Sequence, residues 1–226
     1  MSEQAKVAAA PVGRRRLIVL HSSPVVADAL REGLDGADHV VAVDAFYSWA
    51  DFARRWDFAP AWAIVDAYLD DHVPLALKVR SLVRERSGVI VLGTRYSPAL
   101  RERAFAEGAV AWLEPSRALD SIVTTICAMT AERPHRRPDR AATGTTLTDR
   151  ELQLASLHAS RRGLTPAAIG RSLGLAPATV KTHIAATRRK YRQNGVPVRS
   201  REELAAALIA DGYLIGDDDW QRQARW

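Results

Sequence analysis

The sequence predicts two domains of different class. Residues 14–131 are expected to form an α/β domain with a doubly wound, five-stranded parallel sheet, and residues 147–212 an all-α helix-turn-helix domain. In the first part, short apolar runs alternate with helical patterns, which is typical of a parallel sheet covered by helices on both faces. In the second part, capping residues, prolines and glycines mark the limits of successive helices with no strand pattern between them.

The elements of the α/β part follow from apolar runs and from start and stop signals. Ser48 is a typical helix N-cap, and Gly108 is a typical helix terminator. Runs such as Val89–Leu92 are apolar throughout, as expected of strands buried on both faces. Strands are expected at residues 17–20, 39–46, 61–66, 88–93 and 109–113, and helices at 24–34, 48–56, 74–86, 98–107 and 119–131.

The second part contains clear helix boundaries. Thr148 and Glu151 have the spacing of a capping box, in which each side chain bonds the backbone N–H of the other residue. Thr165 with Pro166 predicts a second helix start, and Gly174 its end. The expected helices begin at 148 and cover 164–174, 175–191 and 201–210. A tight turn between the second and third of these helices predicts a helix-turn-helix.

The third helix of this part has two distinct faces. The face expected to pack on the domain carries Val180, Ile184, Thr187 and Tyr191. The other face carries Lys181, Ala185, Arg188 and Arg192, with Thr182 and Arg189 beside them. A small residue among cations on an outer face suits a helix lying in the major groove of DNA.

Charge is divided unevenly between the two parts. Residues 1–131 hold 15 Lys and Arg against 16 Asp and Glu, whereas residues 133–201 hold 15 against 3, a net charge of +12. This imbalance indicates that only the second part meets a polyanion. We expect double-stranded DNA as the partner, because the cations coincide with the outer face of the third helix.

Several classes of protein are not supported by the sequence. The single cysteine, Cys127, excludes a disulfide framework and is expected to be a buried small residue. No segment has the length of a signal peptide or a membrane span, so we expect a cytoplasmic protein that does not bind membranes. His21 and Ser22 are adjacent at a strand end and cannot aim at each other, and no nucleophile elbow is present. We therefore expect no enzyme, no metal site and no cofactor.

Three segments lie outside the two domains. Residues 1–13 are expected to be disordered, and residues 132–146, rich in proline and arginine, are expected to form a mobile linker. Residues 213–226 form a tail that combines Asp217–Asp219 with Trp220 and Trp226, for which a partly ordered end is expected.

The order and spacing of elements over residues 14–131 resemble the receiver domain of bacterial response regulators, a flavodoxin-like fold. That resemblance implies a phosphoacceptor at Asp66, which ends the third strand. The family's metal-binding acids fall on His21 and Ser22, its Thr or Ser on Gly93 beside Thr94, and its Lys on Glu114 or Pro115. A hard cation needs carboxylates, and a phosphoryl group needs cations. We therefore expect a degenerate receiver pocket.

Three interpretations of Asp66 remain open at this point. It is a structural carboxylate that bonds Ser22 or Thr94, or it is phosphorylated with Asp70 or Asp71 helping to hold a metal. The third interpretation is a small ligand in the altered pocket. A degenerate receiver implies a domain that dimerises, or binds a partner or ligand, without phosphorylation.

Residues 145–212 resemble the DNA-binding domain of the LuxR/NarL family in "LTDRE", "AAIGRSLGLAPATVKTHI" and "RRKY". The chain is therefore identified as similar to an atypical NarL/LuxR-type response regulator, active in transcription. The residues expected to contact DNA are Thr165, Thr179, Lys181, Thr182, His183, Arg188, Arg189 and Arg192. The resemblance implies a homodimer formed through the fourth helix around Leu204, Ala207 and Leu208. This sequence departs from the family pattern at two positions. Ala176 stands where a serine usually caps the third helix, and Ala185 stands where a basic residue is frequent.

Two other functions are kept open by the sequence. One is a conventional two-component response regulator phosphorylated on Asp66. The other is an adaptor that contacts RNA polymerase or a partner protein, because sigma-type helix-turn-helix domains have a similar third helix.

Overall fold

The computed structural model describes residues 15–55, 59–69, 71–94, 97–114, 118–134, 144–160 and 163–216. The segment 1–13, Asp70, Pro115, most of the 132–146 linker and residues 217–226 of the tail, including both tail tryptophans, lie outside the described residues. Within the described ranges, no helix combines the length and apolar character needed to cross a membrane.

The α/β domain is built on a five-stranded parallel sheet with the order β2-β1-β3-β4-β5, the doubly wound order of flavodoxin-like folds. This confirms the fold class expected from the sequence. The strands are β1 (Arg15–Leu20), β2 (Val40–Phe46), β3 (Trp62–Asp66), β4 (Gly88–Leu92) and β5 (Ala111–Leu113). The helices are α1 (Pro24–Asp35), α2 (Trp49–Arg54), α3 (Leu75–Arg84), α4 (Pro98–Ala106) and α5 (Leu119–Thr130).

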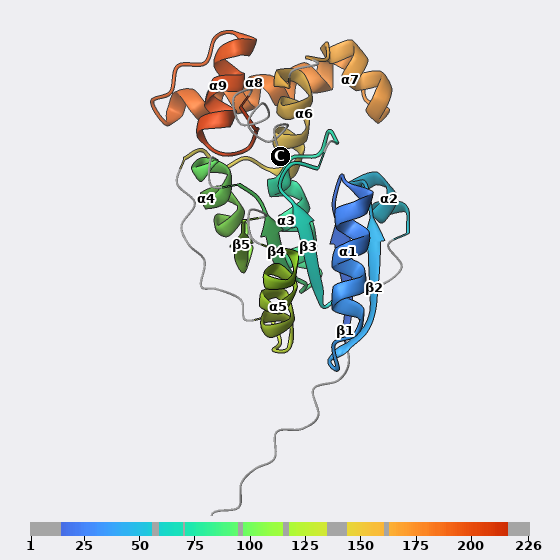
Figure 1. Cartoon of the computed structure of the whole chain (residues 1–226). Helices are drawn as coiled ribbons and strands as arrows, with labels where there is room; N and C mark the ends of the chain where they lie inside the picture. Colours follow the sequence, from blue (N-terminus) through green and yellow to red (C-terminus); the bar gives the residue numbers. More distant parts are fainter. Residues whose placement is uncertain are drawn as a thin grey trace, which may run out of the picture.

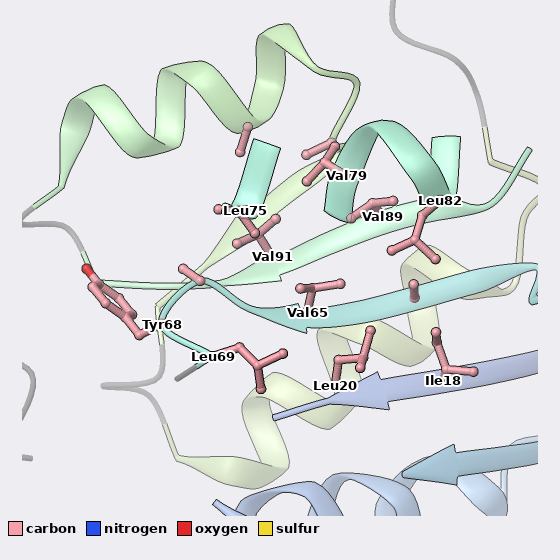
Figure 2. Close-up of a cluster of buried hydrophobic side chains, with 14 of the residues drawn as sticks. Ile18, Leu20, Val65, Tyr68, Leu69, Leu75, Val79, Leu82, Val89 and Val91 are labelled. Atoms are coloured by element: carbon pink, nitrogen blue, oxygen red, sulfur yellow. The ribbon is translucent and has the colours of Figure 1, made fainter. Parts of the chain in front are cut away.

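Both faces of the sheet are buried, because β-branched side chains alternate to opposite sides along β1, β3 and β4. Ile18, Leu20 and Val65 point to the face covered by α2, α3 and α4, where they meet Val79 and Leu82 (Figure 2). The opposite face packs on α1 and α5, and the half-buried Cys127 lies at the edge of that core. The carboxyl ends of the strands therefore carry Asp66 to one edge of a rigid sheet.

The helical domain contains α6 (Asp149–Ala159), α7 (Pro166–Leu173), α8 (Pro177–Gln193) and α9 (Arg201–Ala210). The capping box at the start of α6 is formed as expected, and Thr165 caps α7 through the N–H of Ala168. Ala176, at the start of α8, makes no side-chain capping bond. These four helices enclose a second apolar core that also takes in Ala76 of α3.

The two domains are packed against each other (Figure 1). Arg80 of α3 reaches the carbonyl of Leu147 at 2.9 Å and the carboxylate of Asp149 at 3.0 Å. Thr145, placed in the linker by the sequence, is buried and accepts a bond from Tyr213 at 2.9 Å. The packed part of the chain thus begins before residue 147 and continues past residue 212, because Tyr213 is buried as well.

Candidate functional site

The turn between α7 and α8 is fixed by two glycines. Gly174 ends α7 in the left-handed conformation, with φ of 66°, which suits a residue without a side chain. Gly170 lies one turn earlier, and the N–H of Leu175 bonds its carbonyl at 2.8 Å. A Cβ at residue 170 would lie 2.6 Å from the carbonyl oxygen of Leu175, so only glycine allows this close approach. The two glycines set the angle at which α8 leaves the domain.

One face of α8 is anchored in the domain. Val180, Ile184, Thr187 and Tyr191 are all buried, as the spacing of the sequence indicates. Lys190 adds an ionic anchor, because its Nζ lies 2.6 Å from Oε2 of Glu151 on α6. Burial alone would raise the pKa of Glu151, but hydrogen bonds from Lys190 and Thr148 hold that pKa below its usual range. Lys190, the last cation of "RRKY", therefore holds α8 in place rather than facing outward.

The opposite face of α8 is open to solvent. Of the residues expected to contact DNA, those that are exposed are Thr165, Thr179, Lys181, Thr182, Arg189 and Arg192. Ala185 is exposed between them, so no long side chain holds a ligand away from the middle of this face. The arrangement leaves a cationic helix surface with a small residue at its centre.

Two residues of the expected contact set are less accessible. His183 and Arg188 are half-buried, and Nε of Arg188 is buried with no hydrogen-bond partner among the described residues. The pKa of Glu203 on α9 is lowered mainly by the backbone N–H groups at its helix start, and also by the charge of Arg188. Arg188 therefore lies toward α9, at the edge of the cationic surface.

The residues of the fourth helix, α9, that were expected to form the dimer contact lie inside their own domain. Leu204, Ala207 and Leu208 are buried in the core of their own domain. They are therefore not available to a second chain, and the expectation that this triplet forms the dimer contact is wrong. The sequence pattern shows that α9 has an apolar face but not which helix that face meets.

The pocket at Asp66 is closed by hydrogen bonds within the protein. Asp66 is 2% exposed, and its Oδ2 accepts a bond from the Ser22 hydroxyl at 2.9 Å. Its Oδ1 accepts the N–H of Tyr68 at 2.9 Å. His21 Nδ1 lies 3.9 Å from Asp66 and accepts the N–H of Ser23 at 3.0 Å. Because that nitrogen acts as an acceptor, it carries no proton toward Asp66.

The remaining residues of this pocket are engaged elsewhere. Thr94 bonds the hydroxyl of Tyr68 at 2.7 Å, and that hydroxyl also lies 2.9 Å from Ser97. The indole of Trp112 donates to the carbonyl of Gly93 at 2.9 Å and occupies the space that a side chain at 93 would need. Tyr68 and Trp112 are not identified by the sequence reasoning, since their role depends on contacts across the sheet. Glu114 is half-buried at the end of β5 and supplies no cation.

A magnesium ion, which the receiver resemblance implies, does not fit this pocket. Ser22 and His21 stand where carboxylates are required, and Mg²⁺ binds through oxygen ligands of that kind. The described ranges contain no group of three or more His, Cys, Asp or Glu side chains that could hold a metal. Asp71 is bonded to the buried ammonium of Lys78 at 2.7 Å and to the N–H of Val73, so it is not free to serve as a ligand.

Of the two domains, the helical one matches a known protein family. Residues 145–206 match the family model described as bacterial regulatory proteins, luxR family. They form a LuxR-type helix-turn-helix domain. No curated protein sequence matches the chain. The family match covers the helical domain and does not extend to the α/β domain.

Solved structures with similar folds include several response regulators. ChrA, of a heme-sensing two-component system, is 22% identical, with 94% of this chain and 98% of that chain covered and a TM-score of 0.38. FixJ from B. japonicum is 20% identical, with coverages of 90% and 100% and a TM-score of 0.42. RcsB from Salmonella enterica serovar Typhimurium, bound to promoter rprA with BeF3-, is 16% identical, with coverages of 85% and 98% and a TM-score of 0.46.

Proposed function

We propose that the chain is a cytoplasmic DNA-binding transcriptional regulator that acts by binding rather than by catalysis. The observation that carries the proposal is the exposed cationic face of α8, backed by a buried face that fixes it on the domain. The match of residues 145–206 to the luxR family also supports DNA binding. Lys181, Arg189 and Arg192 neutralise phosphates or contact guanine edges, while Ala185 allows close approach to the groove.

The affinity for DNA is expected to depend steeply on salt, because neutralised phosphates release counterions. We test this by selecting bound fragments from random genomic DNA and measuring their anisotropy with the full chain over a range of salt. Lys181→Ala should weaken binding and reduce the salt slope by about one unit, as expected for one lost phosphate contact.

The matched control is Arg101→Ala, which removes the same charge from an exposed position on α4, away from α8. It should leave affinity and slope unchanged. Equal losses in both variants would show that charge in general, and not the face of α8, attracts the duplex. Failure to enrich any DNA would instead favour an adaptor that binds a partner protein.

We further propose that the α/β domain works without phosphorylation of Asp66. Both oxygens of Asp66 accept bonds from Ser22 and Tyr68, and the nearby ammonium of Lys78 is already paired with Asp71 at 2.7 Å. Incubation with a small phosphodonor and Mg²⁺ should therefore add no phosphoryl group by intact mass. A stable addition that is absent in Asp66→Asn would establish the conventional phosphorylated regulator in its place.

The proposal includes a homodimer on a pseudo-palindromic duplex. Two α8 helices in successive major grooves require half-sites about 34–36 Å apart, which is one helical turn. Since Leu204, Ala207 and Leu208 are buried, the contact between chains lies on another surface. Protection of two half-sites at this spacing, at a stoichiometry of two chains per duplex, checks the dimer.

A further inference from the structure

The outer face of α8 changes in chemical character along its length. This face lies about half a turn from the buried face that anchors the helix in its domain. Its amino-terminal half consists of Ala178, Thr182 and Ala185, which are all exposed. Its carboxy-terminal half carries Arg189 and Arg192, which are exposed as well. The helix therefore presents small side chains at one end and long cationic side chains at the other.

The three small residues form a row along the helix, because their spacings of four and three place them on one side of it. At a rise of 1.5 Å per residue, the row from Ala178 to Ala185 is about 10 Å long. This length corresponds to about three base-pair steps of about 3.4 Å. In a helix-turn-helix, residues in the amino-terminal part of the second helix contact the base edges. The row is therefore the part of α8 that would face the bases.

The hydroxyl of Thr182 is turned back toward its own helix. Its Oγ1 donates a hydrogen bond to the carbonyl of Ala178 at 3.0 Å. The proton of this hydroxyl is therefore used within the helix, and the γ-methyl group is left free to contact a ligand. Since the side chains of Ala178 and Ala185 are methyl groups, the whole row offers methyl groups to whatever lies against it.

The major groove of DNA offers one apolar group to such a row, the C5-methyl group of thymine. Alanine side chains and the methyl group of threonine pack against this group. A G·C pair presents only hydrogen-bond donors and acceptors there, and methyl groups placed against them would exclude water without replacing its hydrogen bonds. A row of methyl groups therefore favours base pairs that contain thymine.

We propose that α8 recognises a thymine-containing core of about three base pairs in each half-site, through the methyl groups of Ala178, Thr182 and Ala185. The inference rests on the DNA binding proposed above and names the sequence that this face selects. Arg189 and Arg192 lie further along the same face, where they contact phosphates or base edges beside this core.

The first test removes single methyl groups from the DNA. Duplexes enriched from random genomic fragments by the full chain are remade with one thymine at a time replaced by deoxyuridine, which lacks only the C5-methyl group. Each replacement within the core should weaken binding about fourfold, which corresponds to the loss of about 0.8 kcal/mol for one buried methylene-sized group. Deoxyuridine outside the core should leave the affinity unchanged.

The second test removes one methyl group from the protein. Thr182→Ser keeps the hydroxyl that bonds the carbonyl of Ala178 and deletes only the γ-methyl group. It should weaken binding to the thymine duplex about fourfold and cause no further loss on the duplex in which its partner thymine is uracil. The matched control is Thr124→Ser on α5, where an exposed threonine bonds the carbonyl of Asp120 at 2.7 Å in the same way. This control should bind both duplexes like wild type.

Two results overturn the inference. One is equal affinity for thymine and uracil at every position of the enriched duplexes. The other is a loss in Thr182→Ser that no uracil replacement removes. The salt dependence of wild type and Lys181→Ala is measured on the same duplexes. Salt-dependent binding that is indifferent to the thymine methyl group overturns this inference alone, whereas the absence of binding to any duplex overturns the proposed function.

Discussion

At the scale of single residues, the pocket at Asp66 illustrates how neutral groups replace charges. A phosphoryl group added to a carboxylate needs nearby cations to offset its charge. Here a serine hydroxyl and a backbone N–H satisfy the two oxygens of Asp66 instead. The ammonium of Lys78 is buried beneath the same loop, where burial lowers its pKa and the charges of Asp71 and Asp66 oppose that shift. The charges in this region therefore stabilise the fold of the loop.

The first prediction at this scale concerns Gly170. A methyl group at this position meets the carbonyl oxygen of Leu175 at 2.6 Å, so Gly170→Ala must displace the backbone of the turn. We expect a loss of about 1–3 kcal/mol in unfolding free energy, the usual cost of overpacking, and weaker duplex binding. Denaturant unfolding and anisotropy measure the two effects.

Gly36→Ala is the matched control for this change. Gly36 has φ of −84° and no atom within 4 Å of the added Cβ, so alanine fits without strain. Its unfolding free energy should stay the same or rise by about 0.4–1 kcal/mol, because alanine reduces the entropy of the unfolded chain. Similar losses in both variants would contradict a specific role for the close approach at the turn.

The hydrogen-bond partners of Asp66 could be predicted only in part from the sequence. The hydrogen bond from Ser22 is confirmed, since Ser22 closely follows β1 and Asp66 ends the neighbouring strand β3. Thr94, the alternative partner, instead bonds the hydroxyl of Tyr68. Tyr68 and Trp112 could not be identified, since the direction of an aromatic ring at a strand end depends on packing that no local pattern encodes.

At the scale of elements, helix starts were more predictable than helix ends. Ser48, Thr148 and Thr165 each accept the expected backbone N–H, because a cap is a contact between residues three apart. The helix expected to end at residue 56 ends at Arg54, and the one expected to end at residue 86 ends at Arg84. Helix ends fray gradually and lack comparably strong local signals here.

A prediction at this scale concerns the anchor between α6 and α8. Glu151 is largely buried, caps α6 and bonds Lys190. Its pKa in the folded protein lies below the ordinary value of 4.5. Its ionised form therefore stabilises the fold above that ordinary value, and this contribution is lost as the pH falls through the lower folded value. Glu151→Gln should reduce the unfolding free energy by about 1–2 kcal/mol at neutral pH.

Denaturant unfolding of wild type and variant at pH 7 and pH 3 measures this effect, and the difference between them should shrink at the lower pH. The control is Glu203→Gln, which alters the equivalent capping box of α9 at an exposed position. It should cost less than Glu151→Gln. A difference between wild type and Glu151→Gln that is independent of pH would rule out the ionised carboxylate as its cause.

At the scale of the whole molecule, the domains share an interface that the sequence did not reveal. The sequence predicted a mobile linker between the domains and no contact between them, yet Arg103 of α4 donates to the carbonyl of Asp211 at 2.9 Å. Its guanidinium also lies 4.1 Å from the ring centroid of Tyr213, a cation–π contact. These partners are about a hundred residues apart along the chain, so no periodicity or spacing indicates that they meet.

The last prediction concerns Arg80, which joins three elements across this interface. It bonds Glu107 at 2.7 Å and Asp149 at 3.0 Å, and only 13% of its side chain is exposed. Arg80→Ala leaves the largely buried carboxylate of Glu107 short of a partner, which typically costs about 3 kcal/mol in a buried pair. We expect this loss in denaturant unfolding, together with separate transitions for the two domains. Arg84→Ala is the control, since Arg84 contacts the same Asp149 from a side chain that is 65% exposed, and exposed pairs contribute less than about 1 kcal/mol. A single transition that Arg80→Ala shifts no further than Arg84→Ala would show that the interface is held by its apolar contacts and not by this ion pair.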